Sequence, residues 1–95
     1  MNIVELHTTD NKISAVKIDS QGEAAITAIK ILKDETLAEH ITKVPAVLVC
    51  ITGETIYETE KGVKESLKMG SYVNIPENVT HWLKATKESH LLLIK

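Results

Sequence analysis

The sequence predicts an all-β domain built from short antiparallel strands that form a sandwich or a barrel. From position 46 onward, runs rich in β-branched residues alternate with turn residues at regular spacing, which is typical of such folds. Phe is absent and only Trp82, Tyr57 and Tyr72 are aromatic, so we expect a core of Ile, Leu, Val and Ala. A chain of 95 residues is long enough for one domain.

The second half of the chain reads as a meander of short strands. Gly53 is expected to end the first of them, and Pro76 to end the fourth. Lys61-Gly62 and Met69-Gly70 are expected to be turns, because glycine accepts the positive φ that tight turns need. The expected strands are Val47–Ile51, Thr55–Thr59, Val63–Leu67, Ser71–Ile75, Thr80–Ala85 and His90–Ile94.

The first half is harder to assign. Ile13–Ile18 is expected to be a strand because of its β-branched residues, and Asp19–Gly22 is expected to be a turn. The segment Glu23–Leu32 fits a helix on propensity because Ala, Leu, Lys and Glu favour one, yet its apolar positions follow neither the helical nor the strand period cleanly. Periodicity alone therefore leaves helix and strand open there.

Composition excludes several classes of protein. The net charge is −2 and acidic and basic residues are interspersed, which argues against a nucleic-acid binder. Cys50 is the single cysteine, so no internal disulfide can form, in agreement with a reducing compartment. The N-terminal residues do not resemble a signal peptide, and the longest apolar run, Ala46–Ile51, is far too short to cross a membrane. We expect a cytoplasmic protein with no nucleic-acid or membrane partner.

Gly70, Pro76 and His81 have the spacing of the second conserved motif of the cupin superfamily, which this segment resembles. Asn78 replaces the glycine that usually follows the proline, and Asn is the next-best residue at a left-handed position. Upstream, His40 to Gly53 has the length of the first cupin motif, with His40 at its first histidine.

Over about residues 24–94, the chain resembles small single-domain, RmlC-like cupins. The resemblance implies a double-stranded β-helix, the cupin jelly-roll barrel, for a single domain spanning 1–95, with N-terminal strands at about 3–18. It also implies that the segment 24–32 is a strand, against its helical propensity.

Alternation along the strands and the cupin pattern together predict a mostly apolar pocket with two imidazoles. Metal-binding cupins usually present three histidines and a glutamate, but here Thr42 and Ala46 stand at two of those four positions. His40 and His81 alone make an incomplete metal site, so we expect no resident cofactor, or a weakly bound divalent transition metal. The predicted pocket wall consists of His40, Thr42, Ala46, Leu48, Cys50, Val73, Ile75, His81 and Leu83.

Other residues receive plainer expectations. Cys50 is expected to be a small buried hydrophobic residue, and Trp82 to face away from the pocket. His7 and His90 belong to no motif and are expected at the surface or at strand ends. No sequence motif for a catalytic nucleophile or a phosphate loop occurs.

Three functions remain open at this point. We expect a protein that binds a small molecule in the barrel without a full metal-ligand set, and a binding protein rather than an enzyme. The alternatives are a metal-dependent dioxygenase or isomerase that uses His40 and His81, and a structural or regulatory dimerisation domain. Val47, Val49 and Ile51 form an apolar stripe on the outer side of their strand, which together with the resemblance predicts a homodimer. Neither the ligand nor the reaction is specified by the sequence.

Overall fold

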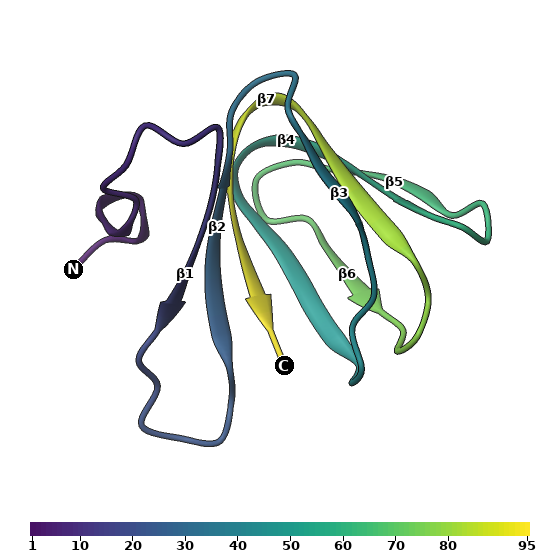
Figure 1. The fold of residues 1–95 in the computed structure, drawn as a ribbon, viewed down its shortest axis with the longest axis horizontal. Helices are drawn as coiled ribbons and strands as arrows, with labels where there is room; N and C mark the ends of the chain where they lie inside the picture. Colours follow the sequence, from purple (N-terminus) through teal and green to yellow (C-terminus); the bar gives the residue numbers. More distant parts are fainter.

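The computed structural model describes all residues 1–95, and almost all of its regular structure is β-strand (Figure 1). One short 3-10 helix, η1, precedes seven strands that pair only antiparallel. The elements are η1 (Ile3–Leu6), β1 (Ile13–Ile18), β2 (Ile26–Ile31), β3 (Thr36–His40), β4 (Ala46–Thr59), β5 (Lys64–Leu67), β6 (Tyr72–Ile75) and β7 (His81–Ile94).

Two long strands, β4 and β7, run through both layers of the fold. They pair with each other from Val47↔Ile94 to Thr59↔His81, with register shifts between Cys50 and Thr55. One half of this pair is flanked by β2 and β1 on one side and by β6 on the other. The other half is flanked by β3 and β5. Each long strand thus contributes to two facing layers, which is how a small sheet protein removes most of its exposed edges.

The core lies between the two layers and is filled by alternate residues of the strands. Ile31, Leu91, Ala85 and Cys50 are completely shielded from solvent. As the composition predicts, the core is aliphatic, with Tyr57 as its one large aromatic member. The buried cluster consists of Ile29, Ile31, Ala46, Leu48, Cys50, Tyr57, Leu67, Ile75, Leu83, Ala85 and Leu91.

The segment 24–32 contains strand β2, as the resemblance implies and against its helical propensity. Both edges of β2 are occupied, because Ile29 lies opposite Ala15 of β1 and Leu91 of β7. Pairing on both edges satisfies the backbone groups that a helix would have bonded internally. The fold around β2, rather than the local sequence, decides its conformation.

Three expectations about strand boundaries are wrong. Gly53 does not end a strand: β4 continues through it to Thr59, and the glycine, at φ +91°, sits where the pairing register shifts. The separate strands expected at 80–85 and 90–94 are one strand, β7. The N-terminal region 3–18 contains only one strand, β1, because Ile3–Leu6 is a 3-10 turn that Asn2 begins by accepting a hydrogen bond from the Val4 amide (2.9 Å).

The turns match the sequence more closely. Gly62 and Gly70 have φ of +86° and +87°, and Asn78 has φ of +60°. Asn at this position therefore replaces the motif glycine in the left-handed conformation that glycine would adopt. No helix in the structure combines the length and the apolar character that spanning a membrane would require.

Candidate functional site

The structure brings His40 and His81 together. They are cross-strand partners between β3 and β7, and their ring centroids lie 4.1 Å apart in an edge-to-face arrangement. His81 is only 3% exposed, whereas His40 is exposed at the edge of the layer. The pair therefore has one buried ring and one that solvent can reach.

Backbone carbonyls orient both rings. His40 Nδ1 lies 2.8 Å from the Ala38 oxygen, and His81 Nδ1 lies 3.2 Å from the Val79 oxygen. Because a carbonyl oxygen only accepts, each Nδ1 carries the hydrogen and donates it. In the neutral rings, the lone pairs are then on the Nε2 atoms. Burial lowers the pKa of His81, and the charge of a protonated His40 would lower it further, while the Val79 carbonyl acts in the opposite direction.

The donor atoms at this place do not fit a resident catalytic metal centre. No group of three His, Cys, Asp or Glu side chains is arranged to hold an ion. The Thr42 hydroxyl donates to the Val44 carbonyl oxygen at 2.7 Å, and Ala46 offers no donor atom. Two imidazoles that bind one ion at a right angle have centroids about 4.5 Å apart, and wider angles need more. The rings of His40 and His81 are closer than that, so they pack against each other.

The other predicted pocket residues are mostly in the core. Ala46, Leu48, Cys50, Ile75 and Leu83 belong to the buried cluster, and Val73 packs against it. Thr42 is 4% exposed, in the turn before β4, where its carbonyl oxygen accepts a hydrogen bond from the Asn78 amide (2.8 Å). Which of the nine predicted residues contact a ligand stays a prediction.

Cys50 is a buried small residue, as expected. It is fully shielded, and its thiol donates weakly to the Thr52 carbonyl oxygen, 3.4 Å away. Burial, followed by the charge of Glu54, raises the pKa of the thiol. Both effects keep it protonated, so it is not poised as a thiolate ligand or nucleophile.

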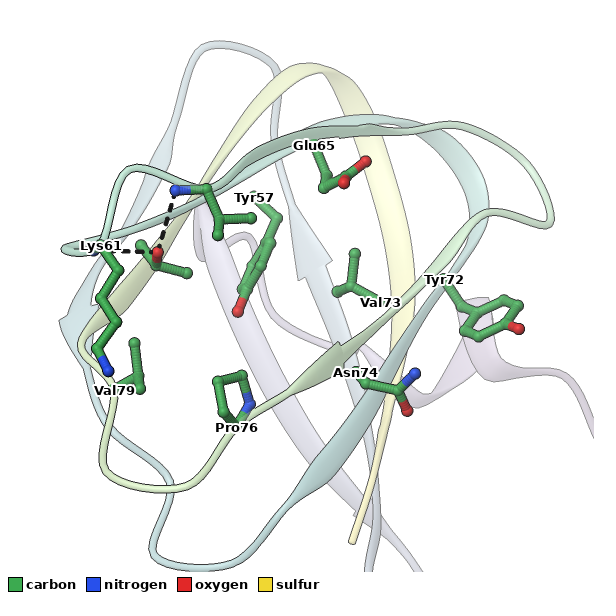
Figure 2. Close-up of a pocket in the computed structure, with 10 residues that line it drawn as sticks. Tyr57, Lys61, Glu65, Tyr72, Val73, Asn74, Pro76 and Val79 are labelled. Atoms are coloured by element: carbon green, nitrogen blue, oxygen red, sulfur yellow. Dashed lines mark hydrogen bonds between the residues drawn. The ribbon is translucent and has the colours of Figure 1, made fainter.

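An open cleft lies at the mouth between the two layers, beside the predicted wall (Figure 2). Its volume is about 390 Å³, within the range of small-molecule sites. It shares only Val73 with the predicted pocket, and we call it the β5–β6 cleft. Its lining residues are Tyr57, Thr59, Lys61, Val63, Glu65, Tyr72, Val73, Asn74, Pro76 and Val79.

Tyr57 links this cleft to the histidine pair. Its ring lies 5.8 Å from that of His81, and Figure 2 shows its hydroxyl end directed toward Pro76 and Val79 across the cleft. The ring is 2% exposed, yet its hydroxyl makes no hydrogen bond within the protein. Burial raises the pKa of this phenol, so it stays a neutral hydrogen-bond donor.

The rim of the cleft is polar and carries both signs of charge. The Thr59 hydroxyl accepts hydrogen bonds from the Lys61 and Val63 amides at 3.2 and 3.3 Å, which fixes the turn that carries Lys61. Glu65 of β5 lies in the same lining. The sequence predicts a strand at Thr55–Thr59 but assigns Tyr57 no role, because the cleft is formed by strands and turns that are distant in sequence. Alternation along the strand places the side chains of Thr55, Tyr57 and Thr59 on the same face, and this pattern could have identified Tyr57 as an inward-facing residue.

Comparison with known proteins supports the fold. No protein-family model matches the chain, and no curated protein matches it. Among solved structures, a cupin superfamily protein from Desulfitobacterium hafniense superposes with a TM-score of 0.83 at 13% identity, over 98% of this chain and 84% of that one. A cupin-2 domain containing protein from Shewanella frigidimarina gives 0.81 at 16% identity, over 100% and 92%.

This chain has the cupin fold. A cupin 2 conserved barrel domain protein from Leptotrichia buccalis adds a TM-score of 0.82 at 23% identity, over 98% of this chain and 45% of that one. The resemblance that the sequence motifs carry is thus confirmed at the level of the barrel. Identities this low establish the shared fold, and the fold alone does not assign a reaction.

Proposed function

We propose that this cupin-fold chain is a binding protein that takes a small, uncharged, polar molecule at the mouth of its barrel. The observation that carries the proposal is the unpartnered Tyr57 hydroxyl facing the β5–β6 cleft. The hydroxyl has no partner within the protein and is not among the fully buried polar atoms, so it is free to donate a hydrogen bond to a ligand in place of water. Because the sulfur of Cys50 is buried and unpaired with another cysteine, we also place the protein in a reducing, cytoplasmic setting.

The lining indicates the kind of ligand. Val63, Val73, Val79 and Pro76 offer an apolar surface, and Tyr57, Asn74 and the rim charges offer hydrogen-bonding groups. Lys61 and Glu65 have opposite charges, so the cleft has no net preference for an anion or a cation. A compact molecule with one apolar face and a hydrogen-bond acceptor directed at Tyr57 fits these features.

The metal-dependent enzyme remains the second candidate, supported by the two Nε2 lone pairs of His40 and His81. A metal ion would require the rings to separate and water or substrate to complete the coordination. Without a third protein ligand, the affinity of this pair for an ion is expected to be low.

The test is an amide NMR screen of the whole chain against a fragment library of uncharged polar compounds. We expect hits to shift the amides of Lys61, Asn74 and Val79. Tyr57→Phe, which removes only the hydroxyl, should weaken the best hit about threefold to tenfold, as expected for one neutral hydrogen bond.

The matched control is Tyr72→Phe: Tyr72 stands at the edge of the cleft, but its side chain is exposed and Figure 2 shows its hydroxyl pointing away from Tyr57, so removing that hydroxyl should leave affinity unchanged. Fragments that bind elsewhere, or bind equally well to Tyr57→Phe, would exclude the cleft as the site. Metal analysis of the same untagged protein distinguishes the metal-dependent enzyme from the small-molecule binding protein. A stoichiometric ion that is lost in a His40→Ala/His81→Ala double variant would favour the enzyme.

A further inference from the structure

A second pair of histidines lies on the outer face of the β1–β2–β7 layer. The expectation that His90 sits at the surface or at a strand end is wrong: it lies within β7 and is 5% exposed. His7 follows η1 and is half-buried, and the two ring centroids are 5.6 Å apart. Strand pairing explains the meeting, because Ser14, Lys30 and His90 form one row across β1, β2 and β7, and His7 bonds to Ser14.

The His7 ring is held by a hydrogen bond at one nitrogen, the His90 ring has only a distant carboxylate beside one nitrogen, and each ring leaves its other nitrogen unpaired. His7 Nδ1 lies 2.8 Å from the Ser14 hydroxyl oxygen, and His90 Nε2 lies 3.9 Å from Glu88 Oε2. The remaining nitrogens, His7 Nε2 and His90 Nδ1, are both buried and have no hydrogen-bond partner. Metal-binding histidines are typically held in this way, with the nitrogen away from the ion directed to a hydroxyl, carbonyl or carboxylate.

The spacing of the rings fits an ion better than a shared proton. Nitrogens of rings whose centroids are 5.6 Å apart come no closer than about 3.3 Å, which is long for a direct hydrogen bond. A ring that binds zinc at about 2.1 Å has its centroid about 3.2 Å from the ion. Two such rings at tetrahedral to trigonal angles have centroids about 5.2 to 5.5 Å apart. The observed separation of 5.6 Å is just above this range, so a small approach of the two rings would bring them to it.

We propose that His7 Nε2 and His90 Nδ1 bind a divalent transition-metal ion of the zinc class on the outer face of the barrel. Imidazole suits zinc, cobalt, copper and nickel, and water would fill the other coordination positions. This pair, like His40 and His81, lacks a third protein ligand, so its affinity for an ion is expected to be low. An opening of about 430 Å³ lies beside His90 and is lined in part by Met1 to Val4 and by Thr52, but not by His7. Both nitrogens are buried, so an ion would enter only after η1 moves aside. No residue of η1 is buried, so this segment can move aside at small cost.

Two charged side chains near the histidine pair are expected to change its affinity for a metal ion. Glu88 contributes a negative charge near His90. Lys30 contributes a positive one near His7, and its ammonium donates to the Thr9 carbonyl oxygen at 3.3 Å. Lys30→Gln should therefore tighten metal binding by removing a repulsion, while Glu88→Gln should weaken it.

The experiment is a titration of the full chain with Zn²⁺ by calorimetry and with Co²⁺ by visible absorption. We expect one ion per chain, at least tenfold weaker binding in His7→Ala, and unchanged binding in the His40→Ala/His81→Ala double variant. His7 sits on a segment that contributes nothing to the core, so its replacement leaves the fold intact even if His90→Ala does not. Absence of saturable binding, full binding in His7→Ala, or loss of binding in the double variant would each overturn the proposal.

Discussion

His81 shows how the barrel interior sets the charge of a side chain. In the unfolded chain its imidazole takes up a proton near the usual pKa of 6.5, whereas burial lowers the pKa in the folded protein. Below pH 6.5 the unfolded state therefore binds more protons than the folded state. The stability associated with neutral His81 is fully present above pH 6.5 and is lost as the pH falls toward the lowered folded-state pKa.

We predict that the free energy of unfolding falls more steeply between pH 6.5 and 5.5 in the wild type than in His81→Gln, which cannot titrate. One proton difference amounts to at most about 1.4 kcal/mol per pH unit. Urea unfolding at pH 6.5 and at pH 5.5 measures the free energy of unfolding of each protein. Carboxylates titrate equally in the wild type and in the variant, so their contribution cancels in the comparison. His7, whose pKa is also lowered, mainly by burial, adds a slope of the same sign that His7→Gln should remove. Equal slopes for the wild type and His81→Gln would contradict the assignment.

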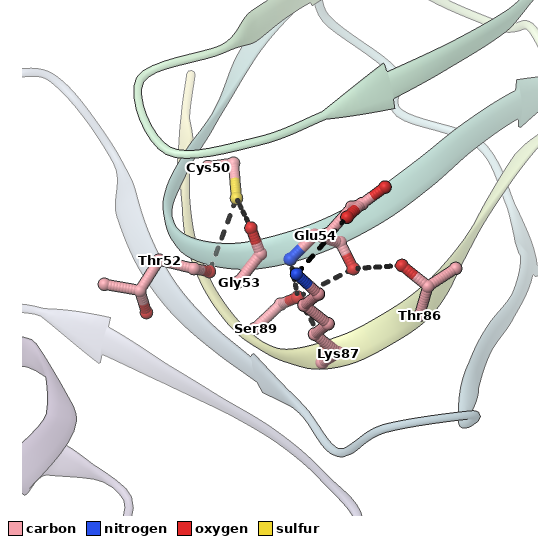
Figure 3. A network of polar contacts seen from close by, with 7 residues as sticks. All are labelled: Cys50, Thr52, Gly53, Glu54, Thr86, Lys87 and Ser89. Carbon is pink, nitrogen blue, oxygen red and sulfur yellow. Dashed lines mark hydrogen bonds and ion pairs between the residues drawn. The ribbon is translucent and has the colours of Figure 1, made fainter.

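Strands β4 and β7 turn from one layer into the other at a corner made by Gly53, Glu54 and Ser89 (Figure 3). The Glu54 amide donates to the Ser89 hydroxyl oxygen at 3.0 Å, and that hydroxyl donates to the Lys87 carbonyl oxygen at 2.8 Å. Ser89 is fully buried, so its side chain satisfies backbone groups that the shifted register leaves unpaired. Thr86 also donates to the Glu54 carbonyl oxygen, at 3.3 Å.

Gly53 is the residue at this corner that no other amino acid can replace without strain. Its φ is +91°, and an added Cβ would lie 2.7 Å from Ser89 Cα and would collide with the Glu88 carbonyl oxygen. Gly53→Ala is predicted to lower the free energy of unfolding by about 2 to 4 kcal/mol. Gly62→Ala is the matched control: its φ is +86°, but nothing lies within 4 Å of the added Cβ, so it should cost about 1 kcal/mol. Equal losses in urea unfolding would show that φ alone, and not the packing of the corner, matters at Gly53.

The corner also shows where sequence reasoning fails. A glycine within a β-rich run is compatible with either a strand end or a bulge. At Gly53 the close approach of Ser89, 36 residues away in the sequence, determines which of the two forms. Local patterns did predict the hairpin at Gly62 and the left-handed Asn78, because turn chemistry is set by neighbouring residues. His40 and His81 meet in the structure, while their role in a binding site stays a prediction. The cleft around Tyr57 and the His7–His90 pair were missed, because both depend on pairings between distant strands.

For the molecule as a whole, an apolar row lies on the outer face of the β1–β2–β7–β4 layer. Val16, Ala28, Leu92 and Val49 follow one another in register across its four strands, with their side chains on the side opposite the core. The 3-10 helix η1 covers part of this face, and Val49 and Leu92 stay only half-buried. A face of this kind is typical of a surface that another subunit covers.

We propose that a second copy of the chain covers this face in a two-fold homodimer. Light scattering after size exclusion should then give twice the chain mass of 10.5 kDa for the wild type. Val49→Lys places a charge where the two copies would meet and should give the single-chain mass, with circular dichroism showing an intact fold. Ile56→Lys is the control, because Ile56 points outward from the same strand in the other layer and should leave the dimer intact. A wild-type protein that has the single-chain mass at every concentration would exclude the dimer, and dissociation by Ile56→Lys but not by Val49→Lys would place the contact on the opposite layer.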